Sequence, residues 1–201
     1  VIFGFGGIFY ALKMMATAMG PMKDMSWFQN LLEHINDSAV VGVGVGTFLT
    51  VLIQSSAATI AILQNLYADG ALSLTGALPV LFGDNIGTAI TTAALAMIGS
   101  NIAAKRVAAS HVLFNVIGTI ICLIALVPYG AFIQYLETTL GLEPKMTIAS
   151  AHGTFNILNT ILQFPFISLL VVIVTKLIPG EDEQIKYSTQ YLDKSLITSA
   201  P

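Results

Sequence analysis

Residues 39–67 of the chain read AVVGVGVGTFLTVLIQSSAATIAILQNLY, and this stretch decides the fold. It contains no charged side chain, yet Gln54, Ser55 and Ser56 stand together near its middle. A straight helix of this length would measure about 43 Å and would overshoot a hydrocarbon core of about 30 Å. The stretch therefore predicts a re-entrant helical hairpin that turns at the polar triplet.

The composition of the whole chain indicates that lipid is its solvent. Of 201 residues, 55 % are hydrophobic and 9 % are charged, and the mean hydropathy is +0.82. Soluble domains carry roughly a quarter charged residues, so a surface this poor in charge favours a membrane. The net charge of −3 argues against a nucleic-acid partner. The single cysteine, Cys122, excludes an intrachain disulfide.

Four further apolar stretches reach or approach the roughly 20 residues that a membrane crossing requires. They cover residues 2–19, 71–101, 107–134 and 147–175. Together with the hairpin they predict an all-α, polytopic transmembrane helical bundle. Because the sequence becomes polar after Lys176, we assign residues 1–178 to a transmembrane half-domain. Residues 179–201 are then a cytoplasmic linker toward a soluble domain, and a start at Val1 predicts a longer protein.

A second irregularity is predicted where residues 83–88 read GDNIGT, shortly after Pro79. This pattern predicts a broken helix, which lipid tolerates only where protein or a wet cavity satisfies the backbone. Thr88 and Thr91 are three residues apart and share one helix face, so their hydroxyls could complete a sodium cage. Asp84, deep in an apolar stretch, must be paired, protonated or bound to a cation. The alternative is a glycine-softened kink with Asp84 beside a wet vestibule.

The triplet at the hairpin turn has side chains suited to both cations and anions. Gln54, Ser55 and Ser56 offer oxygen atoms to a hard cation and hydrogen-bond donors to an anion. A helix start at this point adds amides that favour phosphate, and a helix end adds carbonyls that favour sodium. The competing interpretation is ordinary hydrogen bonding between membrane helices.

A short motif occurs twice in the second half of the chain. Residues 111–119 read HVLFNVIGT and residues 152–160 read HGTFNILNT, with His and Asn four apart on one helix face. With the basic connection Lys105-Arg106 placed inside, residues 107–134 cross outward and residues 147–175 return, which puts the two motifs near opposite membrane surfaces. This topology therefore favours interhelical packing bonds over a joint metal site. Pro165 predicts a kink in the last apolar helix.

An enzyme is the alternative class of function. Ser55 or Ser56 with His111 or His152 would form an intramembrane serine hydrolase dyad. The sequence lacks the usual surroundings of a nucleophilic serine, and the triplet is more typical of a ligand site. We therefore expect no enzymatic activity.

In these motifs the sequence resembles the sodium/phosphate cotransporter family, and its bacterial members most closely. That family has two inverted repeats, each with a Gln-Ser-Ser-Ser-type signature in a hairpin and a Gly-x-Asn-Ile-Gly-Thr segment. Residues 54–59 and 83–88 resemble one copy of each. Residues 105–115 and 151–166 look like the family's second half, and residues 191–193 resemble its linker to a PhoU-type domain.

The resemblance implies sodium-coupled symport of inorganic phosphate by alternating access, with sodium as coupling ion and no organic cofactor. It implies a site in which Gln54, Ser55 and Ser56 serve phosphate and sodium, Thr88 and Thr91 bind sodium, and Thr59, Asp84 and Asn85 give support. Asn85 would position the helix break. Two positions depart from the family pattern: Ala57 replaces the third serine, and Asp84 replaces a small neutral residue.

A transport path in this family needs both signatures, but this chain has one. The resemblance therefore predicts that a first repeat is missing or that a second copy associates in inverted orientation. It also implies a multi-pass protein of the cell membrane, the inner membrane in bacteria. The alternative function is a non-transporting membrane scaffold that anchors a cytoplasmic phosphate-regulatory domain.

Overall fold

The computed structural model describes residues 2–180, apart from the side chains of Ala16, Met19 and Lys23. Every element in this part of the chain is helical, which confirms the predicted all-α class. The elements are α1 (Ile2–Met19), η1 (Pro21–Asp24), α2 (Ser26–Asp37), α3 (Ala39–Ile53), α4 (Ser56–Ala68), α5 (Leu74–Met97), α6 (Ile102–Ile124), α7 (Leu126–Leu140), α8 (Pro144–Gln163), η2 (Phe164–Phe166) and α9 (Ile167–Leu177). Most of the predicted linker, residues 181–201, lies outside the described residues.

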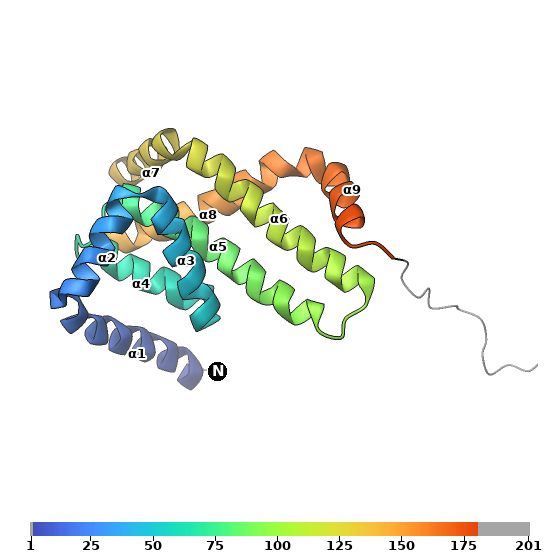
Figure 1. Ribbon diagram of the computed structural model, residues 1–201. Coiled ribbons are helices and arrows are strands. Elements are labelled where there is room, and N and C mark those ends of the chain that lie inside the picture. The colour runs from blue at the N-terminus through green and yellow to red at the C-terminus, as the bar shows by residue number, and fades with distance from the viewer. Residues whose placement is uncertain (1, 181–201) are drawn as a thin grey trace, which may run out of the picture.

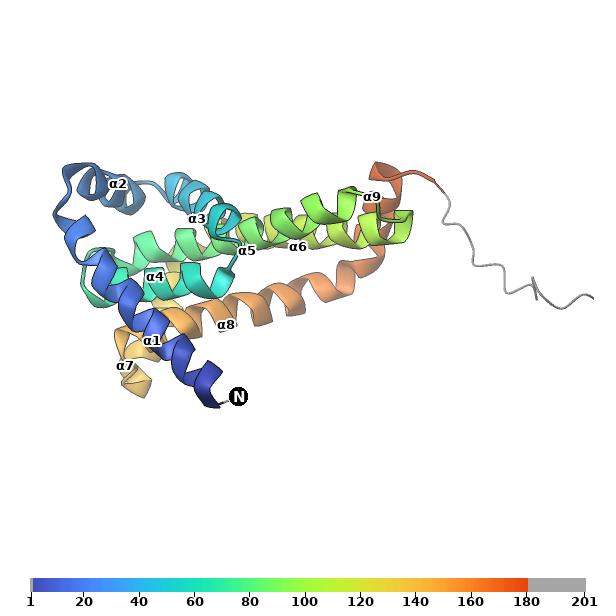
Figure 2. The same ribbon diagram turned by 90° about the horizontal axis from the view of Figure 1, so that it is seen from below.

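Helices α3 and α4 form a hairpin that lies against α5 (Figure 1 and Figure 2). The turn falls at Gln54 and Ser55, as predicted. The arms have 15 and 13 residues, so they measure about 22 and 20 Å and are too short to cross a core of about 30 Å. Arms of this length are expected of a re-entrant hairpin, which enters and leaves the membrane on the same side.

Glycines allow α3 and α5 to approach each other closely. A Cβ atom at Gly83 would collide with the carbonyl oxygen of Val43, and one at Gly87 would meet the carbonyl oxygen of Thr47 at 2.6 Å. On α3, a Cβ atom at Gly46 would collide with the backbone of α5. Small residues at such contacts are typical of tightly packed membrane helices.

The predicted break in α5 is wrong. The helix runs without interruption through Pro79 and the whole of residues 83–88. The glycines in this motif provide room for α3, and the backbone around them stays helical. Asn85 does not position a break, because its Nδ2 donates to the carbonyl oxygen of Leu81 in the same helix at 3.0 Å.

Among the described residues, three helical segments are long and apolar enough to cross a membrane. They are Leu74–Met97, Ile102–Ile124 and Pro144–Leu177, which correspond to α5, α6 and the combined α8–η2–α9. The kink predicted at Pro165 is confirmed, because α8 ends at Gln163 and α9 turns away from it beyond η2 (Figure 1).

The sequence predicts one membrane span over residues 107–134, but in the structure this stretch is divided between two helices. The chain turns at Ala125 between α6 and α7. Beyond the turn, α7 buries Tyr129 and Ile133, and the Tyr129 hydroxyl donates to the carbonyl oxygen of Ala151 in α8 at 2.6 Å. Packing of α7 on α8 therefore redirects a chain whose composition would also suit a longer helix.

The core lies where α5, α7 and α8 meet. Phe82 is fully buried, and its ring centroid lies 5.6 Å from that of Tyr129 and 5.2 Å from that of Phe155. Aromatic pairs at such separations stabilise a core beyond their burial alone. They anchor the middle of α5, the helix against which the hairpin packs.

Between α1 and α3 lies the amphipathic helix α2. It buries Phe28, Leu32 and Ile35 and exposes Trp27. An amphipathic helix of this kind is suited to a membrane–water interface.

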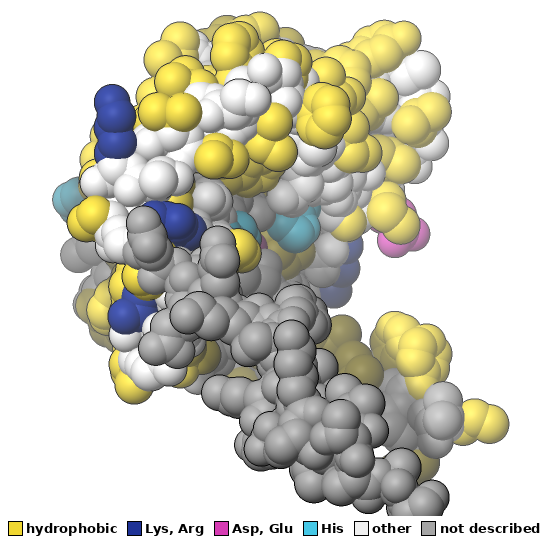
Figure 3. All heavy atoms as spheres, turned by 90° about the vertical axis from the view of Figure 1, so that its right-hand side faces the viewer, with side chains coloured by type: hydrophobic (Ala, Val, Ile, Leu, Met, Phe, Trp, Pro, Cys, Tyr) yellow, Lys and Arg dark blue, Asp and Glu magenta, His cyan; other side chains and the backbone are white. Residues whose placement is uncertain are grey.

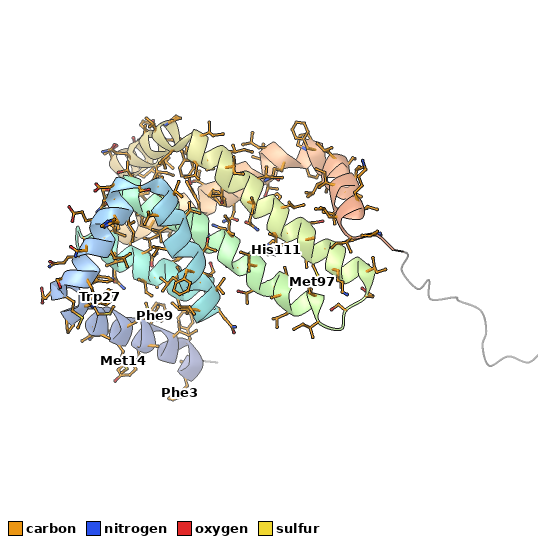
Figure 4. The ribbon with its side chains drawn as sticks, viewed as in Figure 1. Phe3, Phe9, Met14, Trp27, Met97 and His111 are labelled. Carbon is orange, nitrogen blue, oxygen red and sulfur yellow. The ribbon has the colours of Figure 1, made fainter. Side chains whose placement is uncertain are left out.

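The described outer surface is largely apolar. Figure 3 shows hydrophobic side chains over much of one face, with a few separate Lys and Arg side chains among them. Figure 4 shows Phe3 and Met14 of α1 pointing away from the other helices, and Phe3 is 95 % exposed. Such a surface is suited to lipid or to further protein.

Candidate ion-binding site

The hairpin tip is built from two adjacent helix caps. Gln54 ends α3 in the left-handed conformation, with φ 56° and ψ 29°, and its amide donates to the carbonyl oxygen of Thr50 at 2.7 Å. Ser55 is extended and begins α4, and its Oγ accepts a hydrogen bond from the Ala58 amide at 3.3 Å. A glutamine seldom adopts positive φ, and such backbone is often found at functional sites. The last carbonyls of α3 and the first amides of α4 thus meet at the tip.

Asp84 connects both arms of the hairpin to α5. Its side chain is fully buried. Oδ1 accepts from Thr50 Oγ1 at 2.7 Å, and Oδ2 accepts from Ser56 Oγ at 2.6 Å. Thr50 Oγ1 also lies 3.0 Å from Thr59 Oγ1. A buried carboxylate requires partners of this kind, so Asp84 is a paired interior group and not a residue at a wet surface.

Beside Asp84 lies a small pocket of about 100 Å³ that is lined by polar residues. Its lining residues are Thr50, Gln54, Ser56, Thr88, Thr91 and Thr92. Sequence reasoning missed Thr50 and Thr92. The signal for Thr50 was its position in the last turn of α3, just before the polar triplet.

The pocket brings together four of the residues predicted from the sequence: Gln54, Ser56, Thr88 and Thr91. Ser55 does not line it but caps α4 next to it. Thr59 is buried beside Thr50, whereas Asn85 bonds within α5. Ala57, in the place of a third serine, is exposed.

The two His–Asn motifs lie in the interior of α6 and α8, and their place near opposite membrane surfaces stays a prediction. His111 is the tenth of 23 residues in α6, and His152 is the ninth of 20 in α8. Figure 4 shows His111 midway along α6. Asn115 and Asn156 each donate within their own helix at 2.9 Å, so they do not form the expected interhelical bonds. Gln163 of α8 provides one instead, donating to an α6 carbonyl at 2.8 Å.

The hydrogen bonds of the two serines do not resemble a serine–histidine dyad. Ser56 Oγ donates to Asp84, and Ser55 Oγ accepts from the Ala58 amide. A histidine base would need the Ser56 proton, which is directed at a carboxylate.

These features define a polytopic membrane protein of the transporter type, with a polar hairpin tip beside the middle of a spanning helix. Residues 8–142 match the Na+/Pi-cotransporter family, and the chain belongs to that family. It is a multi-pass membrane protein, and its bacterial relatives indicate the inner membrane.

Relatives come from bacteria and animals. The chain is 33 % identical over 178 residues to YqeW of Bacillus subtilis (strain 168), covering 89 % of this chain and 56 % of YqeW. It is 26 % identical over 206 residues to YjbB of Escherichia coli (strain K12), a protein named for inorganic phosphate export. The match covers 98 % of this chain and 35 % of YjbB. It is 28 % identical over 159 residues to sodium-dependent phosphate transport protein 2A of Oryctolagus cuniculus, with coverage of 74 % and 24 %. The chain thus spans from about a quarter to just over half of these relatives. No solved structure matches it.

Proposed function

We propose that the whole protein is a sodium-coupled phosphate transporter, and that this chain supplies one wall of its transport path. The observation that carries this proposal is the pocket at the hairpin tip, where Gln54 and Ser56 meet Thr88 and Thr91 beside the centre of a spanning helix. Discontinuous helices with polar tips at mid-depth are the usual binding elements of secondary transporters.

Phosphate would bind at the start of α4. The first amides of a helix have no acceptor within that helix, and the positive end of the helix dipole lies there. The Ala58 amide donates to Ser55 Oγ, which leaves the amides of Ser56 and Ala57 available to an anion. Gln54 is exposed at the tip and adds side-chain donors.

Sodium would bind on the other side of the tip. Hydroxyl oxygens of Ser56, Thr88 and Thr91 line the pocket, and Gln54 can add its side-chain oxygen. The last carbonyls of α3 and the Ser55 backbone lie next to it. Hard cations prefer such oxygen ligands. The proposal therefore requires sodium as coupling ion and no organic cofactor.

Sodium also offsets the charge of the substrate. Moving one charge across the membrane potential costs about 2.3 kcal/mol per 100 mV, so inward movement of divalent phosphate costs about twice that amount. Two sodium ions would make the cycle electrically neutral, and a third would make it charge-moving. Alternating access then requires an opposite wall, supplied by a first repeat elsewhere in the protein or by an inverted second copy.

The test is uptake of labelled phosphate by the full-length protein in proteoliposomes. We expect an inward sodium gradient to drive uptake and Gln54→Ala to reduce it at least about tenfold, the loss typical of removing a charge-assisted hydrogen bond. The matched control is Gln134→Ala, an exposed glutamine on α7, which should transport like the wild type. Reversing the gradient measures direction, which matters because one relative is named for export.

Phosphate uptake that depends neither on sodium nor on the side chain of Gln54 would contradict this function. It would favour the non-transporting membrane scaffold, in which the chain anchors a cytoplasmic phosphate-regulatory domain.

A further inference from the structure

Two hydroxyls of the pocket direct their protons at Asp84. Thr50 Oγ1 donates at 2.7 Å and Ser56 Oγ at 2.6 Å. A hydroxyl has one proton and two lone pairs, so both groups have only lone pairs left for a ligand. The carboxylate therefore determines what these two residues offer to the pocket.

The three threonines on the α5 side have their protons engaged as well. Thr88 donates to the carbonyl oxygen of Asp84 at 3.0 Å, Thr91 to that of Gly87 at 2.9 Å, and Thr92 to that of Thr88 at 3.0 Å. The protons of all five hydroxyls are thus engaged, so each of them can offer only lone pairs to a ligand. Among the lining side chains, the donors that remain are those of the Gln54 amide.

We propose that Asp84 sets the charge selectivity of this pocket, making it a monovalent cation site and excluding phosphate from it. This inference rests on the proposed transport function and deepens it. A cation on the oxygen of Thr50 or Ser56 stands one hydroxyl away from the carboxylate. In a buried setting the attraction between such charges is far stronger than in water.

Phosphate meets the opposite conditions in the same pocket. It needs hydrogen-bond donors, whereas the hydroxyls present acceptors, and the nearby carboxylate repels it. Phosphate therefore binds outside the pocket, at Gln54 and the first amides of α4. Within residues 2–180 no group of three or more His, Cys, Asp or Glu side chains could hold a metal ion, so one carboxylate behind neutral oxygens is suited to a single positive charge.

The first experiment measures cation binding without transport. The thermal unfolding midpoint of the purified full-length protein is titrated with NaCl against choline chloride, in the absence of phosphate. We expect saturable stabilisation by sodium, and Asp84→Asn should raise the half-effective sodium concentration about 30-fold. Glu137→Gln is the matched control, because Glu137 is also a hydrogen-bonded carboxylate but lies on α7 outside the pocket. It should leave the titration unchanged.

A second variant separates charge from packing. Asp84→Glu keeps the charge but enlarges a fully buried side chain, whereas Asp84→Asn keeps the size. If charge selects the ion, Asp84→Glu retains more sodium affinity than Asp84→Asn. If both variants lower stability equally at every sodium concentration, Asp84 is only a structural link and the proposal is overturned.

The uptake assay provides the third arm. Asp84→Asn should weaken the apparent sodium affinity about 30-fold while leaving the phosphate KM at saturating sodium unchanged. A raised phosphate KM with unchanged sodium affinity would overturn the proposal. If sodium stabilises the wild type but no phosphate is taken up, the transport function alone is refuted. If sodium does not stabilise the wild type, the cation pocket alone is refuted.

Discussion

Thr50 Oγ1 lies 2.7 Å from Asp84 Oδ1, so a side chain from α3 is bonded to the middle of α5 four residues before the hairpin turn. The other carboxylate oxygen accepts from Ser56 at the start of α4. One buried residue therefore joins three helices at the pocket. The stability of the hairpin and the properties of the site depend on the same group.

Replacing Thr50 with valine should destabilise the protein with little change in shape. The variant removes a hydrogen bond to a buried charged group, which costs about 2 kcal/mol. We expect the thermal unfolding midpoint to fall by about 4–8 °C. Thr138→Val is the control, because Thr138 is exposed on α7 and bonds within its own helix. Equal losses in the two variants would argue against a special role for the Thr50–Asp84 bond.

The close contact of α3 and α5 predicts opposite effects for two neighbouring glycines. Gly46→Ala should cost about 3 kcal/mol or more, because its Cβ atom would collide with the α5 backbone. Gly44→Ala should be neutral or slightly stabilising, because no atom lies within 4 Å of its Cβ position and alanine favours the helix. Thermal unfolding in detergent compares the two. Similar midpoints would mean that the helices lie farther apart than described.

The bond between α4 and α7 should contribute to stability independently of the site. The Tyr67 hydroxyl lies 3.1 Å from both carboxylate oxygens of Glu137. Burial, together with the hydrogen bond and charge of Glu137, raises the pKa of Tyr67 to about 12 from 10.0. The stabilisation that the Tyr67–Glu137 bond provides is therefore fully present below pH 10.0, the ordinary pKa of tyrosine. It is lost as the pH rises through the raised pKa of about 12.

Tyr67→Phe should accordingly lower the free energy of unfolding by about 1–2 kcal/mol, with the same difference from about pH 7 to about pH 9. Tyr135→Phe is the control, since Tyr135 is 61 % exposed on α7. A loss that disappears within this pH range would contradict the assigned bond. Phosphate uptake should change in neither variant.

Water should reach the hairpin tip at mid-depth. In a Cys122→Ser background, we expect a charged, water-soluble thiol reagent to label Gln54→Cys, because Gln54 is exposed beside the pocket. Ile157→Cys, on an apolar surface of α8 that is 62 % exposed, should resist the same reagent if it faces lipid. Labelling of both positions, or of Ile157→Cys alone, would refute this arrangement.

Several features followed from the sequence alone because they depend on neighbouring residues. A charge-free stretch too long for one span, with three polar residues near its middle, determined the hairpin and its turn. Pro165 determined the kink before α9, since proline lacks the amide that a regular helix needs. The residue types at positions 54, 56, 88 and 91 indicated an ion site, and the structure brings these residues into one pocket.

Only the tertiary structure decided how these local pieces are used. Residues 83–88 have the composition of a helix break, but α5 stays regular because α3 packs against its glycines. The pairing of Asp84 with Thr50 joins residues 34 positions apart, a separation at which no local periodicity operates. Sequence sets what each segment can form, whereas contacts between distant segments determine which polar groups are buried, paired and left open to an ion.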